Sequence, residues 1–74
     1  MKYKLETLDL HGIYHKEAEI LIDHFIIDNK DNFPVEIITG NSIRMQEILK
    51  KIVEFHGLSM RVKSYVNLGA FIIS

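Results

Sequence analysis

The sequence predicts a small α/β fold, an α+β two-layer sandwich whose elements follow the order strand–helix–strand–helix–strand–strand. Hydrophobic residues recur with a period of two in two segments and with the helical period in two longer ones, and an apolar run ends the chain. The chain has 74 residues, of which 47% are hydrophobic, enough for one compact core. It has no cysteine, which excludes disulfide frameworks, zinc–thiolate sites and thiol nucleophiles. We therefore expect a single domain over residues 1–74.

The first strand and the first helix are expected in the first 28 residues. Residues 4–10 alternate polar and apolar side chains, the pattern of a half-buried strand, and His11-Gly12 ends it. From Lys16 onward the apolar spacing becomes helical. The apolar side of this helix comprises Ala18, Leu21, Ile22, Phe25 and Ile26. The turn-prone residues 29–32 mark its end.

The second strand and the second helix follow the only proline. Val35–Thr39 is short and rich in β-branched residues, which favours a strand. Gly40-Asn41 predicts a tight turn, and Ser42 or Asn41 is a good N-cap for the helix that follows. Its apolar side comprises Met45, Ile48, Leu49, Ile52 and Val53. Gly57 is placed to end this helix in the left-handed conformation.

The last two strands are expected to form a hairpin. Residues 58–63 alternate apolar and polar side chains, residues 67–69 supply a turn, and residues 70–73 form the terminal strand. Two right-handed crossovers make the first three strands parallel and place both helices on one face of the sheet. The fourth strand runs antiparallel to the third. The expected architecture is a four-stranded mixed sheet with one face uncovered.

The charge is unevenly distributed along a nearly neutral chain. The net charge of −1 argues against a generally basic nucleic-acid binder. Residues 1–38 nevertheless carry four Lys/Arg against eight Asp/Glu, whereas residues 39–74 carry five against two. The longest apolar run, residues 70–73, is far too short to cross a bilayer, and no signal peptide is recognisable. We expect a cytoplasmic protein with no membrane partner.

Two loops are the expected place for a ligand. In open sheets, ligands collect beyond the carboxyl ends of parallel strands. Residues 9–12 and 39–42 both follow such strands and open a helix, where unpaired amides attract an anion. The spacing therefore predicts an anion site near His11, Gly40 and Ser42. The chain contains neither a P-loop nor a GxGxxG motif.

The first loop also resembles a known family signature. Residues 8–12 spell LDLHG at the end of the first strand, and this resembles the signature of the Smr (small MutS-related) domain. The resemblance extends over nearly the whole chain, through Glu17-Ala18 in the acidic helix and Ile37-Ile38 leading into a glycine loop. Residues 39–42 read TGNS, where the family usually has HGxG or TGxG. The resemblance implies a stand-alone Smr-like domain with the architecture of the C-terminal domain of bacterial translation initiation factor three.

The resemblance implies binding of RNA or DNA and, in some members, endonuclease activity. The matching positions are Asp9 and His11 in the first loop and Thr39 and Gly40 in the second. Histidine exchanges protons near neutral pH, and an aspartate can orient it or hold a divalent cation such as Mg²⁺. Amides of Gly40 to Ser42 could stabilise charge on a reacting phosphate. If the family's second histidine is needed for cleavage, Thr39 makes this chain a binder that does not cut.

Structural alternatives accompany these roles. Asp9 could instead accept hydrogen bonds from backbone amides near the first helix, and His11 could hold the first turn. The four histidines lack the spacing of a metal site, so no metal ligands are assigned and the cofactor stays open. The remaining candidates for phosphate or nucleic-acid contact are Gly12, Asn41, Ser42, Arg44, Arg61 and Lys63, with Tyr3 and Tyr65 to stack bases.

A protein-interaction domain is the alternative from another class. On the uncovered sheet face, alternate residues such as Ile38 and Ile72 are expected to form an exposed apolar patch. Such a patch would support a homodimer or docking onto a larger protein partner.

Overall fold

A computed structural model of the protein describes residues 5–74 and confirms the predicted order of elements. The strands are β1 (Thr7–Asp9), β2 (Val35–Ile38), β3 (Met60–Ser64) and β4 (Asn67–Ile73). The helices are α1 (His15–Asp28) and α2 (Ile43–Phe55). Within this part of the chain, no helix has the length and apolar character needed to cross a membrane.

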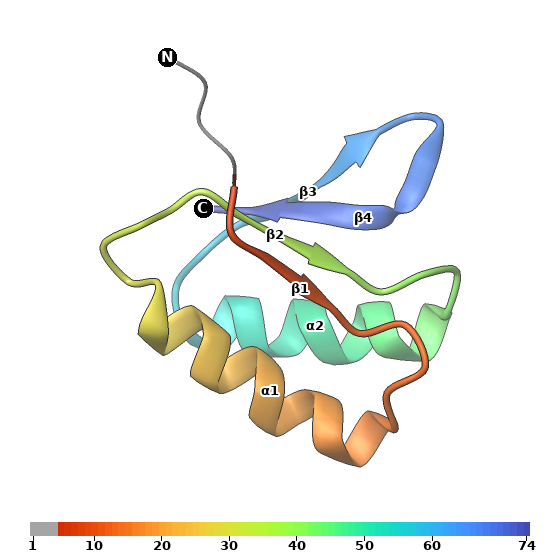
Figure 1. The fold of residues 1–74 in the computed structure, drawn as a ribbon, viewed down its shortest axis with the longest axis horizontal. Coiled ribbons are helices and arrows are strands. Elements are labelled where there is room, and N and C mark those ends of the chain that lie inside the picture. The colour runs from red at the N-terminus through yellow and green to blue at the C-terminus, as the bar shows by residue number, and fades with distance from the viewer. Residues whose placement is uncertain (1–4) are drawn as a thin grey trace.

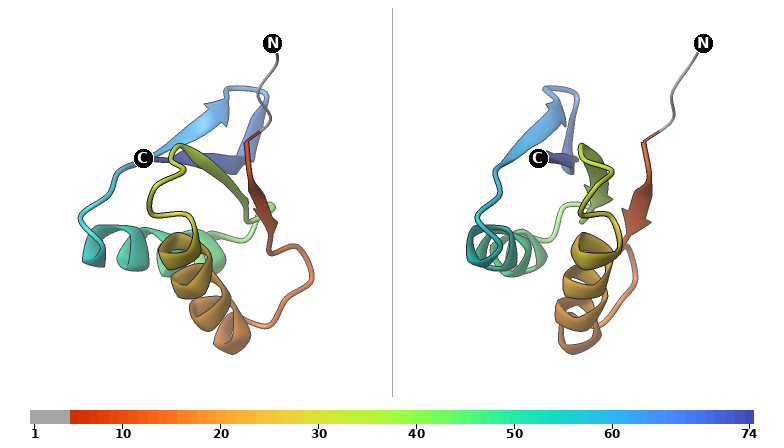
Figure 2. Two further views of the ribbon diagram at one scale, coloured as in Figure 1. Left: turned by 60° about the vertical axis from the view of Figure 1, so that its left-hand side comes forward. Right: turned by 90° about the vertical axis from the view of Figure 1, so that its left-hand side faces the viewer.

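The four strands form a mixed sheet in the order β1-β2-β4-β3. β1 pairs with β2 in parallel, and β4 is antiparallel to both of its neighbours, β2 and β3. β1, β2 and β3 therefore run in one direction, as predicted. Both helices lie on the same side of the sheet (Figures 1 and 2). This confirms the two-layer arrangement, and among residues 5–74 no helix lies on the other face of the sheet.

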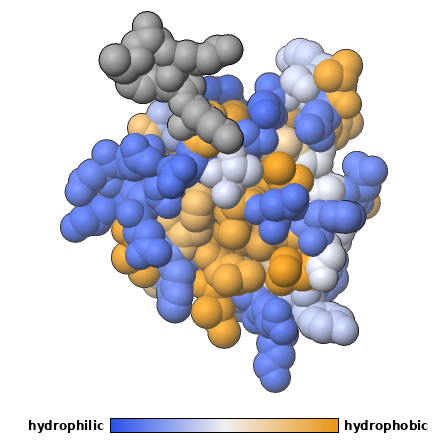
Figure 3. All heavy atoms as spheres, in the orientation of Figure 1, coloured by the Kyte–Doolittle hydropathy of each residue, from blue (hydrophilic) through white to orange (hydrophobic). Residues whose placement is uncertain are grey.

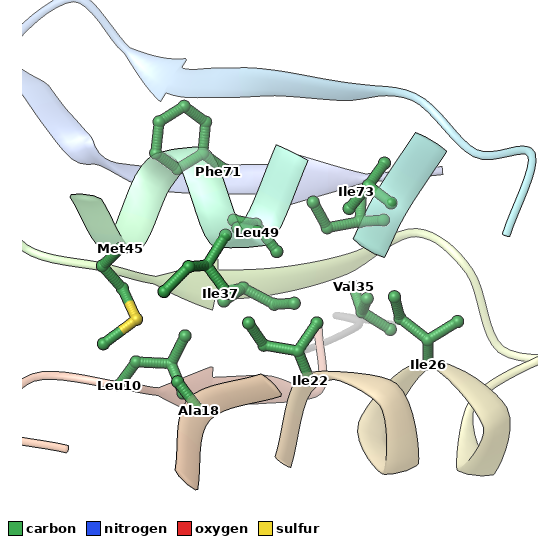
Figure 4. Packing of buried hydrophobic residues seen from close by; sticks show 12 residues of the cluster. Leu10, Ala18, Ile22, Ile26, Val35, Ile37, Met45, Leu49, Phe71 and Ile73 are labelled. Atoms are coloured by element: carbon green, nitrogen blue, oxygen red, sulfur yellow. The ribbon is translucent and has the colours of Figure 1, made fainter. Parts of the chain in front are cut away.

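The core fills the space between the sheet and the two helices (Figure 4). The helices contribute Ala18, Ile22, Ile26, Met45, Ile48, Leu49 and Val53, and the sheet layer contributes Leu10, Val35, Ile37, Phe71 and Ile73. Leu21, expected on the buried side of α1, is 38% exposed. The apolar arc of α1 is wider than its contact with the sheet, and hydrophobic side chains gather over α1 and β1 (Figure 3).

The hairpin differs from the predicted one in the place of its turn. The turn falls at Tyr65 and Val66, and Asn67 already pairs with Ser64, so residues 67–69 are strand. The reason is tertiary, because the carbonyl of Gly69 accepts hydrogen bonds from the amides of Thr39 (2.8 Å) and Gly40 (3.1 Å). Those bonds make β4 begin at Asn67, whereas the turn-prone composition of residues 67–69 predicts that it begins at residue 70. The ends of β1 and β3 also shift by one to three residues from the predicted ones.

Both predicted ends of α2 are confirmed. The Ser42 hydroxyl caps the helix by accepting a hydrogen bond from the Met45 amide at 3.1 Å. At the other end Gly57 has φ +72°, and its amide donates to the carbonyl of Glu54 while the amide of Leu58 donates to that of Val53. This pair of bonds is a Schellman motif, which satisfies carbonyls that the helix leaves open.

His56 joins the end of α2 to α1. Its Nε2 lies 2.6 Å from Oδ1 of Asp23, and the imidazole is mostly buried. We expect His56→Ala to lower the free energy of unfolding by about 1–2 kcal/mol, because it removes a partly buried hydrogen bond and leaves Asp23 without its partner. Urea unfolding monitored by circular dichroism measures this. His15→Ala, at an exposed position, should change stability by less than about 0.5 kcal/mol. Equal effects would contradict a stabilising role for the His56–Asp23 contact.

Candidate functional site

The loops that follow β1 and β2 lie side by side at one edge of the sheet. The amide of Leu10 donates to the carbonyl of Ile38 at 2.8 Å, which holds the start of the first loop against the end of β2. The second loop is tied to the start of β4 through the carbonyl of Gly69. The β3–β4 turn lies at the same end of the molecule (Figures 1 and 2). Three connections therefore meet at the carboxyl edge of the sheet, where a ligand site was expected.

In the first loop, Asp9 has a structural role. Its Oδ1 accepts a hydrogen bond from the backbone amide of His11 at 2.9 Å, and the amide of Ile13 donates to the carbonyl of Leu10. Gly12 has φ +80°, a conformation that favours glycine. The side chains of Asp9 and His11 are both exposed, and the His11 ring makes no hydrogen bond to another described residue. The loop thus presents an imidazole on a backbone that the Asp9 carboxylate helps to hold.

In the second loop, two expected phosphate ligands are engaged inside the fold. Thr39 is only 4% exposed, and its hydroxyl lies within hydrogen-bonding distance of the carbonyls of Gly40 (2.9 Å) and Gly69 (3.2 Å). The amides of Gly40 to Ser42 were expected to be available to a phosphate. In the structure the Gly40 amide donates to the Gly69 carbonyl. Gly40 thus contributes to this edge through hydrogen bonds within the fold, from its amide to Gly69 and from Gln46 to its carbonyl.

The start of α2 carries the donors that remain. Ser42 Oγ is occupied by the Met45 amide, while the amides of Ile43 and Arg44 have no partner among the described residues. The guanidinium of Arg44 is exposed and forms only a loose ion pair with Glu47 at 3.7 Å. Asn41 is exposed in the turn before the cap. This helix end offers backbone amides and an exposed guanidinium to an anion.

Gln46 is a residue of this edge that the sequence reasoning did not identify. Its Nε2 donates to the Gly40 carbonyl at 3.1 Å and approaches the Leu68 carbonyl at 3.5 Å. It lies four positions after the Ser42 cap, one helical turn into α2. Its spacing of four residues from the cap could have identified it, because side chains four residues apart lie on the same side of a helix. Gln46 braces the glycine loop against the hairpin.

Lys63, which was expected to contact nucleic acid, forms an ion pair on the uncovered sheet face. Its ammonium lies 3.1 Å from both carboxylate oxygens of Glu36, whose residue is only 7% exposed. The bond reaches across β4 from β3 to β2. Arg61 is exposed on the same face of β3 and has no ion pair within the described residues. Of the two expected cations on this strand, Arg61 is the one left for a ligand.

The predicted apolar patch on the uncovered sheet face is wrong. Ile72 is only 7% exposed, and Ile38 is partly buried. Ile72 lies between Glu36 and Arg61 in the strand register. Ile38 and Ile72 therefore do not form the exposed apolar patch that was expected on this face.

The tip of the hairpin is exposed. Tyr65 is 93% exposed, and Val66 beside it is equally open. A ring in this position is available for stacking. Tyr3, the other expected stacking residue, lies outside the described residues.

A divalent cation fits the donors of this edge poorly. Within residues 5–74, no three His, Cys, Asp or Glu side chains are placed together to hold a metal ion. Asp9 supplies a carboxylate, but one of its oxygens already accepts the His11 amide.

The fold and this edge define a small α+β domain with an open mixed sheet and an exposed loop pair at its carboxyl edge. No family model, no curated protein and no solved structure matches the chain.

Proposed function

We propose that the chain is a cytoplasmic, Smr-like nucleic-acid-binding domain that contacts a phosphodiester backbone at the carboxyl edge of β1 and β2. The observation that carries this proposal is the bond from the Leu10 amide to the Ile38 carbonyl, which holds the LDLHG loop beside the loop that opens α2. It places His11 and Arg44 at one edge, both exposed. The LDLHG sequence in this place supports the same family.

The proposed contacts follow from the cations that the fold leaves exposed. Arg44 and the amides of the first turn of α2 bind a phosphate, because a helix N-terminus and a guanidinium both favour an anion. Arg61 contacts the backbone further along, on the uncovered face. Tyr65 stacks a base at the hairpin tip. With a net charge of −1, long-range attraction is weak, so these local contacts carry the affinity.

A salt titration tests the binding function. Labelled single- and double-stranded RNA and DNA are titrated with the protein at several salt concentrations. Replacing Arg44 or Arg61 by alanine should weaken binding. Each substitution should also reduce the magnitude of the slope of log K against log salt by about one, which corresponds to the loss of one phosphate contact. Lys30→Ala is the matched control, an exposed cation just beyond the C-terminal end of α1. Unchanged affinity in both arginine variants, or binding indifferent to salt, would contradict the proposed interface.

Endonuclease activity is the second candidate, and it depends on the His11 ring. This imidazole is exposed at the same edge as Arg44, where it could exchange a proton with a bound phosphodiester. Thr39 offers no second acid–base group, since it is buried and bonded to backbone carbonyls. A single acid–base residue is expected to give slow cleavage.

A cleavage assay separates binding from catalysis. His11→Ala should lower the rate of product formation by about 10²-fold, with binding changed much less. Asp9→Asn should preserve most of the rate, because the amide oxygen of asparagine can still accept the His11 amide. Product that forms equally fast in His11→Ala, or no product from the wild type, removes the catalytic part and leaves the binding proposal standing.

A further inference from the structure

A groove runs between α1 and α2 on the side of the helices that faces away from the sheet. Its larger part has a volume of about 670 Å³ and is lined by residues of both helices, including Ile20, Ile52 and Phe55. A second hollow of about 340 Å³ continues it toward the start of α2. Glu19, Lys51 and Ile52 line both parts, so the two form one groove.

The groove exposes large apolar side chains. Phe55 is 83% exposed and Ile20 is 59% exposed, and Ile27 is also exposed on α1. Such residues add nothing to the core when they face water, and a cluster of them marks a surface for a partner. On the uncovered sheet face, by contrast, Ile72 is buried. The apolar surface available to a partner therefore includes the helical layer.

The groove carries charges of both signs. On the α1 side lie Glu19, Asp23 and His24, and on the α2 side lie Arg44, Glu47, Lys51 and Glu54. α1 and α2 run in the same direction (Figure 1). A twofold axis parallel to the groove then places α1 of each copy against α2 of the other. In this arrangement Glu19 comes opposite Lys51 of the other copy, because these two residues lie at the same level of the groove and line both of its parts.

We propose that the groove between α1 and α2 is the dimer interface of this protein, occupied by the same groove of a second copy. This inference uses the outer side of the helices, and it meets the proposed function at Arg44, which lines the second hollow and is also the proposed phosphate contact. Since the axis runs along the helices, both carboxyl edges lie at the same end of the dimer. Two phosphate-binding edges could then engage one nucleic acid together.

The size of the molecule predicts a weak, reversible dimer. A standard interface buries about 800 Å² on each partner, which is about one seventh of the 5443 Å² surface of this chain. Two helices of 14 and 13 residues present a face only about 20 Å long. The dimer should therefore form and dissociate over an accessible concentration range.

Sedimentation equilibrium from about 1 µM to about 1 mM tests the interface. The wild type should pass from monomer to dimer, and Phe55→Lys should raise the dimer Kd at least about tenfold. Val66→Lys is the control, an equally exposed apolar residue at the hairpin tip. Circular dichroism verifies that each variant is folded. A protein that stays monomeric throughout, or a dimer that Phe55→Lys leaves unchanged, overturns the proposal.

Charge reversal tests the pairing of the two copies. Glu19→Lys alone and Lys51→Glu alone should each weaken the dimer, since each faces a like charge in the other copy. An equal mixture of the two variants should dimerise again, because every facing pair is then of opposite sign. Recovery in the mixture requires contact between copies and cannot come from repulsion relieved within one chain. Failure of the mixture to recover would overturn this arrangement.

Discussion

Replacing Gly69 by alanine is expected to lower the free energy of unfolding by about 2–3 kcal/mol. A Cβ at this position would lie 2.6 Å from the carbonyl oxygen of Gly40, with the carbonyl carbon and Cα of Gly40 also closer than 3 Å. These are backbone atoms, so no side chain can rotate away. Either β4 or the loop before α2 must move, and both carry the hydrogen bonds from Thr39 and Gly40 to the Gly69 carbonyl.

The same substitution should weaken nucleic-acid binding, because the displaced loop leads directly into the start of α2. Gly12→Ala is the matched control at the other loop of the edge. A Cβ there meets nothing within 4 Å, so only its left-handed conformation at φ +80° opposes alanine, at about 1–2 kcal/mol. Urea unfolding and the salt titration measure both variants. If Gly69→Ala were no more destabilising than Gly12→Ala, the close approach of β4 to the Gly40 loop would not be a constraint on the fold.

The elements of this fold were predictable because their signals are local. Ala18, Ile22 and Ile26 recur at helical spacing and are buried together. Ser42 and Gly57 mark the ends of α2 through capping chemistry that involves only neighbouring residues. The direction of β1, β2 and β3 followed from the handedness of crossovers. Each of these inferences needs a few residues of sequence and no knowledge of distant partners.

The departures from prediction all involve distant pairs. Residues 67–69 have the composition of a turn, yet they belong to β4 because Gly69 pairs with a loop 29 and 30 residues earlier in the chain. Strand order is another example, since hairpin logic says that β4 adjoins β3 but not that it also adjoins β2. The alternation of polar and apolar residues in β3 correctly placed Lys63 on the uncovered face. It could not predict that Lys63 pairs with Glu36 of β2, on the far side of β4.

The candidate site was predictable in position and less so in chemistry. The rule for parallel strands placed Asp9, His11 and the Gly40 loop at one edge, where they lie. The rule does not say which donors remain free once the fold has formed. Thr39 and the Gly40 amide are used within the fold, and Gln46 enters the site from a helix face that periodicity assigned to solvent. Satisfaction of buried polar groups is a property of the whole fold.

Removing the Lys63 ammonium should destabilise the fold more than it weakens nucleic-acid binding. Lys63→Met is expected to lower the free energy of unfolding by about 2 kcal/mol, because it leaves the mostly buried carboxylate of Glu36 without its cation. The loss is smaller than for a fully buried pair, because about half of the lysine side chain is exposed and solvent screens its charge. Urea unfolding of Lys63→Met, compared with Arg61→Ala on the same face, measures the effect.

A double variant separates the ion pair from other contributions of Lys63. Glu36→Gln combined with Lys63→Met removes both charges, so the double variant should recover most of the stability that Lys63→Met loses. Arg61→Ala should change stability by less than about 0.5 kcal/mol but lower the salt slope of binding. The reverse pattern, in which Lys63→Met leaves stability intact and reduces the salt slope, would mean that Lys63 contacts a phosphate in the complex. Lys63 would then pair with Glu36 only in the free protein and with a phosphate in the complex.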